Sequence, residues 1–387
     1  MFLVDKPYVS EFLANSLEKN QREVIATAEA KLLLKGKNIN WLNETDAQNK
    51  ILAHGAKIYS NSENCIAWLA NHLGEHPLNQ QINFLKDKIK FRELLAENFP
   101  DFLFKKLSLE ELQNLRAENL QFPLVLKPSV GFFSIGVHII EDEQALAKAK
   151  KLLTPQELGN DYPQEVVDTS SFILEEFIEG AEYAIDSYTN NEGEVVILSI
   201  LEHQFKSSTD TSDRIYSTSL QLINKYEEKI KVFLTTISNK LAFKNFPFHT
   251  EIRITKNGEI KPIEINPLRF GGWCTTADLN WYAYGINSYE YFFNQQQVDW
   301  NKTLEKGRDK KYSLVILDNV TELKNEAILR FDYTQLKKDY PSILELRELD
   351  IQTYPVFGFM FIETPHNDYT ILNELLHTDF KKYIRVR

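Results

Sequence analysis

FHTEIRITKNGEIKPIEINP, residues 248–267, is the most informative segment of this chain. Two strand-like runs flank Asn257 and Gly258. An Asn-Gly pair between such runs is the strongest short signal for a β-hairpin, because a type I′ turn needs positive φ at both central residues. The sequence therefore predicts an antiparallel hairpin whose turn is closed by Lys256 and Glu259. A G1-bulge turn is the alternative, and it would shift the pairing register.

This hairpin would bring two carboxylates face to face. In the predicted register Glu251 lies opposite Glu264 and His249 lies opposite Asn266, all on the same side of the strand pair. Directly opposed side chains have Cβ atoms roughly 4.5–5.5 Å apart, where two carboxylates repel. A cation between them removes the repulsion, and two carboxylates with an amide oxygen suit Mg²⁺. The other interpretation is a solvated hairpin face whose charges carry no function.

Composition limits the class of protein. A length of 387 residues predicts two or three domains. The chain is 43% hydrophobic and 26% charged, as expected of a globular protein with ordinary cores. Its formal net charge of −11 argues against nucleic acid as the main partner, because binding a phosphate backbone requires a basic surface. One concentrated phosphate site remains compatible with this charge.

Cysteine usage and hydropathy indicate where the protein acts. Cys65 and Cys274 are the only cysteines, and their spacing fits neither a disulfide framework nor a zinc site, so we expect two buried, inert thiols. The N-terminal residues lack the basic and apolar regions of a signal peptide. No run approaches the ~18 apolar residues of a membrane-spanning helix. We therefore expect a cytoplasmic protein without a membrane partner.

The order of the predicted elements suggests three segments. Residues 1–85 alternate short apolar runs with helix-like stretches, which predicts an α/β domain with a small, mostly parallel sheet. This domain lacks a GxGxxG fingerprint, so a dinucleotide site is not supported. Residues 86–300 form the predicted core, with a lid subdomain at about 120–180 and an amphipathic helix that begins at Asn83. Residues 301–387 read as a small C-terminal α+β domain.

A lysine follows a buried strand in the core. FPLVLKPSVGFFSIGV places Lys127 at the strand end, before a loop that contains Ser129, Gly131, Ser134 and Gly136. Such a lysine supplies charge, and small residues expose backbone N–H groups, so together they can hold a polyphosphate. The Walker A order is absent. A snorkelling lysine beside an ordinary turn is the alternative.

The segment ILEEFIEGAEYAID, residues 173–186, suggests a nucleotide-binding linker. A strand runs into Glu175 and Glu176, breaks at Gly180 and resumes with Glu182. An extended linker across a cleft can offer backbone groups to an adenine edge, and a carboxylate beyond the glycine can hold ribose hydroxyls. The alternative is a strand–bulge–strand with exposed glutamates.

Together these segments resemble the ATP-grasp superfamily, and within it the branch of D-alanine–D-alanine ligases and L-amino-acid ligases. The resemblance covers roughly residues 83–291, and the order of the motifs is more specific than any one of them. It implies an ATP-grasp fold with an N-terminal α/β domain, ATP as cofactor, and Mg²⁺ or alternatively Mn²⁺. It assigns the phosphates to Lys88 and Lys127, a flexible lid to residues 129–136 with Ser134 and Gly136 at its tip, the adenine edge to Glu175, Glu176, Phe177 and Ile178, the ribose to Glu182, and the metal to Glu251, Glu264 and Asn266.

The chain also departs from the usual pattern. EINPLRFGG has one residue more than E-I-N-P-R-x-G-G, so Arg269 is displaced by one position. The run RFGGW resembles bacilysin-type L-amino-acid ligases, in which the arginine engages the substrate carboxylate or the tetrahedral intermediate and the tryptophan walls the acceptor pocket. Trp273 is alternatively a core aromatic. His249 either neutralises acyl-phosphate charge or hydrogen-bonds Asn266, and we favour the hydrogen bond. Arg214 is a solvated loop residue, or contacts substrate if its loop closes over the site.

These features predict an ATP-dependent ligase. The enzyme would activate a carboxylate as an acyl phosphate and join it to an amine, releasing ADP and phosphate, with Arg269 and His249 as catalytic residues. Its substrates would be small molecules, either amino acids or small peptides, and a homodimer is compatible with the sequence. Three alternatives stay open: a different nucleophile, a peptide or protein acceptor, and an ATP-binding sensor without turnover.

Overall fold

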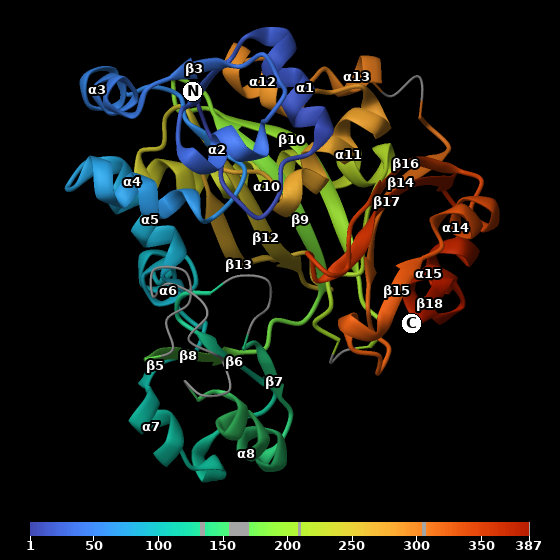
Figure 1. Ribbon diagram of the computed structural model, residues 1–387. Coiled ribbons are helices and arrows are strands. Elements are labelled where there is room, and N and C mark those ends of the chain that lie inside the picture. Colours follow the sequence, from blue (N-terminus) through green and yellow to red (C-terminus); the bar gives the residue numbers. More distant parts are fainter. Residues whose placement is uncertain (132–135, 155–169, 208–209, 304–306, 387) are drawn as a thin grey trace.

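The computed structural model describes residues 1–131, 136–154, 170–207, 210–303 and 307–386. Ser134, at the tip of the predicted lid, lies outside these residues. Within them, a small antiparallel sheet with helices α7 (Leu109–Asn114) and α8 (Glu143–Leu152) projects below a larger body, and the two are joined near α6 (Lys88–Leu95) (Figure 1). The body contains the N-terminal sheet and a long sheet that continues into the C-terminal segment.

The N-terminal unit contains the small parallel sheet that the sequence predicts, with strand order β3-β2-β1-β4. Polar side chains begin its first three helices: Ser10, Thr27 and Asn43 each accept a hydrogen bond from a backbone N–H three residues later. Cys65 is buried in the core, and both cysteines are free and buried as predicted. The elements are β1 (Phe2–Leu3), α1 (Glu11–Asn20), β2 (Glu23–Ile25), α2 (Ala28–Leu33), β3 (Asn40–Leu42), α3 (Glu44–His54), β4 (Tyr59–Ser60) and α4 (Cys65–Leu73).

Two helices, α5 (Pro77–Lys86) and α6 (Lys88–Leu95), replace the single helix predicted from Asn83. They separate at Asp87, whose backbone is extended and whose carboxylate accepts hydrogen bonds from the N–H groups of Ile89 and Lys90. An aspartate favours this N-cap role because its side chain satisfies N–H groups that have no partner in the first turn. The break makes Lys88 the first residue of α6.

The small sheet is antiparallel, with strand order β5-β8-β6-β7. Glu175 lies opposite Val125 in the β6–β8 ladder, so Lys127, two residues further along β6, lies on the same face as Glu175. The sheet therefore presents both charged side chains toward the body. Its elements are β5 (Phe104–Ser108), α7 (Leu109–Asn114), the 3₁₀ turn Ala117–Asn119, β6 (Leu124–Pro128), β7 (His138–Ile140), α8 (Glu143–Leu152) and β8 (Ser171–Glu176).

The long sheet has eight antiparallel strands in the order β13-β12-β9-β10-β11-β14-β17-β16. Strand β14 follows residue 300 and pairs with β11, so one sheet continues from the predicted core into the predicted C-terminal domain. The domain division itself stays a prediction. The strands are β9 (Ala181–Thr189), β10 (Val195–Gln204), β11 (Ile215–Thr218), β12 (Phe246–Ile254), β13 (Ile260–Pro267), β14 (Lys310–Asp318), β16 (Ile343–Glu348) and β17 (Val356–Pro365).

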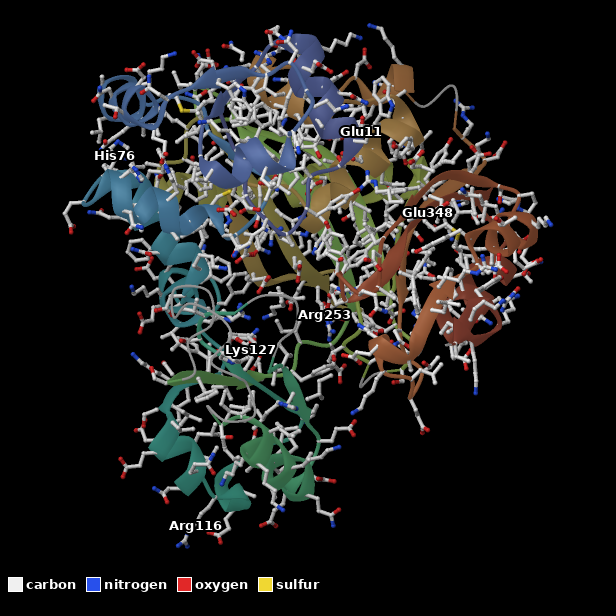
Figure 2. All side chains as sticks on the ribbon, in the orientation of Figure 1. Glu11, His76, Arg116, Lys127, Arg253 and Glu348 are labelled. Atoms are coloured by element: carbon white, nitrogen blue, oxygen red, sulfur yellow. The ribbon has the colours of Figure 1, made fainter. Side chains whose placement is uncertain are left out.

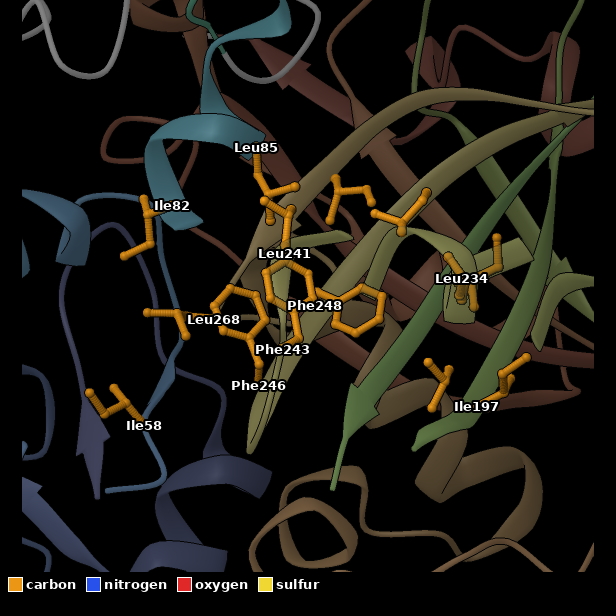
Figure 3. Close-up of a cluster of buried hydrophobic side chains, with 14 of the residues drawn as sticks. Ile58, Ile82, Leu85, Ile197, Leu234, Leu241, Phe243, Phe246, Phe248 and Leu268 are labelled. Carbon is orange, nitrogen blue, oxygen red and sulfur yellow. The ribbon is translucent and has the colours of Figure 1, made fainter. Parts of the chain in front are cut away.

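The main core lies between this sheet, helix α10 (Leu220–Leu241) and the N-terminal unit (Figure 3). Leu234 from α10 packs in the same cluster as Phe248 from β12 and Ile58 from the N-terminal unit. The rings of Phe243 and Phe246 stack with centroids 4.2 Å apart. Burying each such side chain contributes about 1.5–3 kcal/mol, so this cluster holds the hairpin strands firmly against the N-terminal unit.

Further helices cover the upper part of the long sheet, and a C-terminal layer packs beside β14 and β17. None of the helices among the described residues is long and apolar enough to cross a membrane. The remaining elements are α11 (Thr275–Tyr284), α12 (Ser288–Asn294), α13 (Trp300–Thr303), β15 (Ile328–Phe331), α14 (Tyr333–Asp339), α15 (Thr370–His377), β18 (Ile384–Val386) and the 3₁₀ turns Gly272–Cys274, Asn325–Ala327 and Lys381–Tyr383.

The hairpin turn differs from the predicted type I′ turn. Thr255, one residue earlier than predicted, donates its N–H to the carbonyl of Glu259 at 2.9 Å. Only Gly258 has positive φ in the turn, at 83°, which is the pattern of a three-residue loop with a G1 bulge. The ladder is therefore shifted by one residue near the turn, where Ile254 faces Ile260.

A second irregularity restores the predicted register. The ladder shifts between Glu251 and Ile252, because Ile252 faces Pro262 whereas Glu251 faces Glu264. Ile263 is the extra residue of this bulge, next to a proline that has no N–H to donate to a ladder. The predicted opposition of Glu251 and Glu264 is therefore confirmed, although the predicted turn is wrong.

Candidate active site

A cavity of about 620 Å³ lies where the small sheet, the long sheet and the C-terminal strands meet. Lys127 on the small sheet and Arg253 on β12 border this junction (Figure 2). Among the described residues, the cavity is lined by most of the residues that the sequence singled out: Lys88, Lys127, Glu175, Glu176, Phe177, Ile178, Glu182, His249, Glu251, Glu264, Asn266, Arg269 and Trp273.

The facing carboxylates differ strongly in their affinity for protons. Burial raises the pKa of Glu251 well above its ordinary value, and the negative charge of Glu264 raises it further. Burial also opposes ionisation of Glu264, but Lys88, 3.2 Å away, and a 3.0 Å hydrogen bond from the Asn266 amide hold its pKa below the ordinary value. The surrounding protein therefore supplies too little positive charge to favour ionisation of both carboxylates.

This donor set fits a hard divalent cation. Glu251, Glu264 and Asn266 offer only oxygen ligands, and an added positive charge would allow both carboxylates to ionise. Across the residues that the structure describes, no group of three or more His, Cys, Asp and Glu side chains is arranged for metal binding. A metal here would therefore depend on the amide oxygen and on a ligand beyond the two carboxylates, such as a phosphate.

The two predicted phosphate-binding lysines are both held by protein groups. Lys88 donates from Nζ to the Gly131 carbonyl at 3.1 Å, and its backbone N–H donates to Ser129. Lys127 lies 2.6 Å from Glu175, which also pairs with Arg92 at 2.8 Å. Burial alone would raise the pKa of Glu175, but Arg92 and Lys127 hold it at about 2.

Residues 175–178, which the sequence assigns to the adenine edge, have fewer polar groups available for a base than predicted. Because the Glu175 carboxylate pairs with two cations, it is not free to meet a base. The N–H of Phe177 donates to the Pro123 carbonyl at 3.2 Å, and the carbonyl of Ile178 accepts from Arg253 at 2.7 Å. The Phe177 carbonyl and the Ile178 N–H belong to one trans peptide and point in opposite directions, so only one of them can pair with the adenine edge.

Gly180 and Glu182 lie where this segment reaches the long sheet. Gly180 has φ of 135°, and a Cβ atom there would lie 2.4 Å from the Ile254 carbonyl oxygen, so only glycine fits without a shift. Glu182 contacts His203 at 2.9 Å and Arg253 at 3.0 Å. His203 also stacks on Tyr216, and the sequence offered no signal that it would lie beside Glu182.

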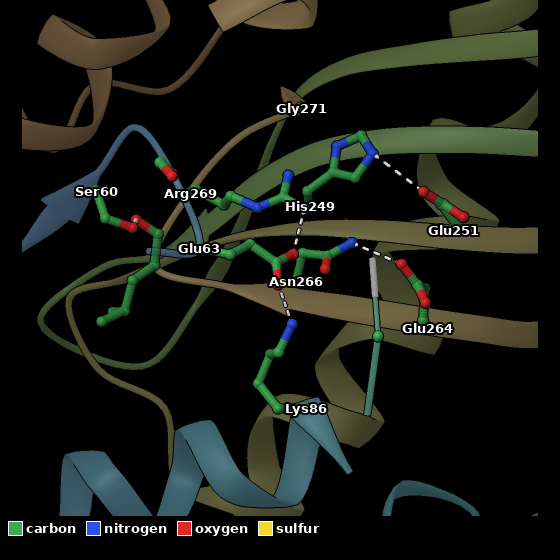
Figure 4. A network of polar contacts seen from close by, with 12 residues as sticks. Ser60, Glu63, Lys86, His249, Glu251, Glu264, Asn266, Arg269 and Gly271 are labelled. Carbon is green, nitrogen blue, oxygen red and sulfur yellow. Dashed lines mark hydrogen bonds and ion pairs between the residues drawn. The ribbon is translucent and has the colours of Figure 1, made fainter. Parts of the chain in front are cut away.

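Arg269 is fixed by a partner that the sequence did not reveal (Figure 4). Its Nη2 lies 2.7 Å from Glu63, in the loop between β4 and α4, and its Nη1 donates to the Phe270 carbonyl at 2.9 Å. Glu63 also pairs with Lys86. Burial opposes ionisation of Glu63, but Lys86 and Arg269 hold its pKa at about 2. The guanidinium thus enters the cavity wall in a defined orientation.

His249 is oriented by Asp186 rather than by Asn266, so the favoured hydrogen bond was wrong. The two residues face each other in the β9–β12 ladder, and His249 Nδ1 lies 2.7 Å from Asp186. Asp186 also accepts from the N–H of Gly271 at 3.0 Å and from the hydroxyl of Thr276. The other ring nitrogen of His249 lies 3.8 Å from Glu251 (Figure 4).

Trp273 lies in an aromatic cluster, as one of the two interpretations expected, and its role toward an acceptor stays a prediction. It lines the cavity, and it also packs on Tyr8, with ring centroids 5.8 Å apart, and on Phe359, with centroids 5.6 Å apart. Its φ of 58° is left-handed, so the local backbone, and not only packing, directs the indole.

The predicted substrate role of Arg214 is wrong. Its side chain has 0% exposure and pairs with Asp318 at 2.6 Å. It also donates to the Thr378 carbonyl at 2.5 Å and lies over the ring of Phe380. Arg214 is therefore a buried link to the C-terminal layer, because a guanidinium inside a protein needs partners for its charge and its N–H groups.

The chain shares its fold and part of its sequence with known proteins. An ATP-grasp domain model matches residues 120–277. The fold superimposes on an L-amino acid ligase from Bacillus licheniformis with a TM-score of 0.70 at 16% identity, covering 100% of this chain and 98% of the other. An N5-carboxyaminoimidazole ribonucleotide synthetase from Thermotoga maritima gives a TM-score of 0.65 at 17% identity, covering 100% and 98%. The chain therefore has an ATP-grasp fold, and its residues 120–277 match the ATP-grasp domain model.

Its sequence is similar to amino-acid ligases. The alanine–anticapsin ligase of Bacillus subtilis (strain 168) is 26% identical over 201 residues, which is 49% of this chain and 42% of the relative. The alanine–anticapsin ligase of Bacillus amyloliquefaciens is 26% identical over 182 residues, 44% and 38% of the two chains. The match thus spans about two-fifths of the length of these curated relatives.

Proposed function

We propose that this protein is an ATP-dependent carboxylate–amine ligase that forms ADP and phosphate. The observation that carries the proposal is the facing pair Glu251 and Glu264, which lies in one cavity with Lys88, Lys127 and Arg269. Carboxylates that bind a metal, lysines for phosphates and an arginine for a carboxyl group are the set that this reaction needs. Its substrates would be amino acids or small peptides, as the similarity to amino-acid ligases suggests.

The nucleotide would bind along the small sheet and its link to the long sheet. We assign the phosphates to Lys88 and Lys127, the adenine to the backbone of Phe177 and Ile178, and the ribose to Glu182. Glu251, Glu264 and Asn266 would hold Mg²⁺, or alternatively Mn²⁺, which when bound offsets the phosphate charge. Lys88 and Lys127 are buried, which strengthens their electrostatic effect on a bound triphosphate.

The reaction would have two steps. A carboxylate oxygen of the first substrate attacks the γ-phosphorus of ATP, the bond to the β-phosphate oxygen breaks, and ADP leaves. The amine of the second substrate then attacks the acyl carbon, the bond to phosphate breaks, and the amine gives up a proton. We assign Arg269 to the reacting carboxyl group, because a guanidinium can donate to two oxygens at once.

His249 would act on the acyl phosphate. Asp186 orients its ring, and the ring nitrogen that does not face Asp186 points toward Glu251. In this position a protonated imidazole would stabilise the negative charge that develops on the phosphoryl oxygens. The role of Glu63 is to hold Arg269 in place, and it has no assigned contact with substrate.

Product identification tests the proposal. Wild-type protein with ATP, Mg²⁺ and pooled amino acids should release ADP and phosphate and form a new amide, detected by mass spectrometry. Arg269→Ala should lower kcat/KM by an amount equivalent to about 2–4 kcal/mol with little change in ATP affinity. AMP as the product would overturn the mechanism. Tight ATP binding without turnover on any amine would indicate a sensor, and loss of ATP affinity in Arg269→Ala would place the arginine at the nucleotide.

A further inference from the structure

One wall of the cavity is apolar and comes from the C-terminal strands. Leu314 and Ile316 on β14 and Val356 and Phe359 on β17 line it, together with Trp273 from the loop after β13. Leu314 and Phe359 are almost fully buried, whereas Ile316 and Val356 are half-buried. Every residue assigned above to the nucleotide or the metal lies outside β14 and β17, so the proposed function has not used this wall.

The strand ladders explain why these side chains form a continuous surface. Leu314 and Ile316 are two residues apart and share a face, and Ile316 lies directly opposite Phe359. Val356 and Phe359 are three residues apart, so in a regular strand they would point to opposite faces. The ladder shifts at Asp318, which faces Val356, whereas Leu317 faces Gly358. This bulge turns Val356 toward the cavity as well.

The bulge depends on a glycine, which indicates that the wall is preformed. Gly358 has φ of 154°, and a Cβ atom there would lie 2.0 Å from the Arg347 carbonyl oxygen. Arg347 in turn pairs with Asp278 and donates to the Trp273 carbonyl at 3.4 Å. Trp273 is thus held by its backbone as well as by its ring contacts, and the surface needs little reorganisation to receive a ligand.

The apolar wall is a poor binding surface for the polar groups of the substrates. Phosphates, bicarbonate and ribose gain nothing from aliphatic and aromatic surface and lose their hydration there. A hydrocarbon side chain gains about fourfold in affinity for each CH₂ that it buries. At its edge the wall ends at Asp318, whose charge is offset by Arg214, so the patch has a defined boundary.

We propose that the face formed by β14 and β17 is the side-chain pocket for an amino acid with a bulky apolar side chain. This inference rests on the proposed ligase function and names the class of one of its substrates. It also gives the C-terminal segment a role, since the selectivity of the enzyme would be set by residues outside the segment that matches the ATP-grasp domain model.

The test compares amino acids that differ only in apolar side-chain size, in assays of ADP release with wild type, Ile316→Trp and Ile316→Ala. Wild type should prefer leucine or phenylalanine to glycine by about tenfold or more in kcat/KM, because each methylene buried in such a pocket is worth about fourfold. Ile316→Trp fills the pocket and should abolish that preference while glycine and alanine are still used. Ile316→Ala should shift the optimum toward larger side chains. Val320→Trp, at an exposed position just beyond β14, is the matched control and should change nothing.

Calorimetry provides a readout that does not depend on turnover. Leucine should bind wild type in the presence of ADP and Mg²⁺, and Ile316→Trp should weaken binding at least tenfold while ADP binding is unchanged. A wild type that prefers glycine or polar amino acids, or an Ile316→Trp variant with unchanged selectivity, would overturn the inference and leave the ligase proposal standing. If no amino acid supports ADP release, the proposed function fails, and calorimetry still decides whether the pocket binds an apolar side chain.

Discussion

Glu63 and Arg269 form a buried ion pair, with Oε1 and Nη2 2.7 Å apart, across 206 positions of sequence. Glu63 belongs to the N-terminal unit, and Arg269 follows the hairpin that carries Glu264. Each side chain exposes only about a tenth of its surface, at 10% and 11%. The pair therefore connects the N-terminal unit directly to the group that we assign to the substrate carboxyl.

Glu63→Gln tests this connection. The change removes the charge that orients Arg269 and pairs with Lys86, so the KM for the carboxylate substrate should rise and kcat should fall, whereas the KM for ATP should stay within about twofold. Breaking a buried pair should also cost about 3–5 kcal/mol of stability. Steady-state kinetics and urea unfolding measure the two effects.

A matched control separates positioning from general destabilisation. Glu290→Gln breaks the 2.6 Å pair of Arg22 and Glu290, which also joins the N-terminal unit to the body but lies outside the cavity lining. Glu290→Gln should lower stability slightly and leave both KM values unchanged. Equal kinetic effects in Glu63→Gln and Glu290→Gln would show that Glu63 acts only on the fold.

The two facing glutamates should respond oppositely to substitution in metal-free protein. Glu251 has a raised folded pKa, so its contribution to stability is lost as pH rises from its ordinary value of 4.5 through the folded value. Glu251→Gln should therefore stabilise the protein at pH 8, by about 1–3 kcal/mol, and have no benefit at pH 4. Glu264→Gln removes the partner of Lys88 and should therefore destabilise the protein.

Thermal unfolding with EDTA and with Mg²⁺ measures these changes. Mg²⁺ should raise the Tm of wild type most in the presence of ATP and raise that of Glu264→Gln little, and Glu264→Gln should lose nearly all turnover. Full activity in Glu264→Gln would remove Glu264 from the metal assignment. Equal stability of Glu251→Gln and wild type across the pH range would show that the carboxylates do not repel.

Glu175 should control acid stability. Its folded pKa of about 2 lies below its ordinary value of 4.5, so the stability it contributes is present above pH 4.5 and is lost as pH falls toward 2. Glu175→Gln leaves Arg92 and Lys127 buried without their carboxylate and should cost about 3–5 kcal/mol at pH 7, with a flatter stability profile between pH 4.5 and 2. Chemical unfolding at several pH values measures both. Glu176→Gln, on the same strand but with a carboxylate that meets only the Leu103 N–H, should change stability by less than about 1.5 kcal/mol.

Gly180 should not tolerate a side chain. Gly180→Ala combines a positive φ with a contact of 2.4 Å to the Ile254 carbonyl, so it should cost about 1–3 kcal/mol and weaken ATP binding by moving the link between β8 and β9. Gly193→Ala has a comparable backbone conformation, with φ of 91°, but its nearest contact is 3.4 Å. If Gly193→Ala proves as costly as Gly180→Ala, backbone strain rather than the close approach explains the requirement. Unfolding and nucleotide titrations provide the measurements.

The hairpin shows how a correct local prediction can rest on two errors that cancel. The turn closes at Thr255 rather than Lys256, which shifts the ladder by one residue, and the bulge at Ile263 shifts it back before Glu251 meets Glu264. The turn type depends on backbone angles that an Asn-Gly pair permits but does not require. The bulge carbonyls accept from Arg92, about 170 residues earlier, so no local pattern could have predicted that contact.

By itself the sequence determined the features that arise from short-range chemistry. These are the small parallel N-terminal sheet, the buried thiols, the lysine at the end of β6 and the opposed carboxylates of the hairpin. Alternation of apolar residues and turn chemistry act over a few residues, so both can be recognised in a single sequence.

Only the tertiary structure decided which partners the buried charges have. Asp186 orients His249 because β9 pairs with β12, Glu63 holds Arg269 because the N-terminal unit packs beside the hairpin, and Arg214 is buried where a polar loop suggested solvent. A buried charge must be paired, but the rule does not say by which residue. The identity of the partner depends on how distant strands and segments pack together, and such contacts produce no periodic pattern in the sequence.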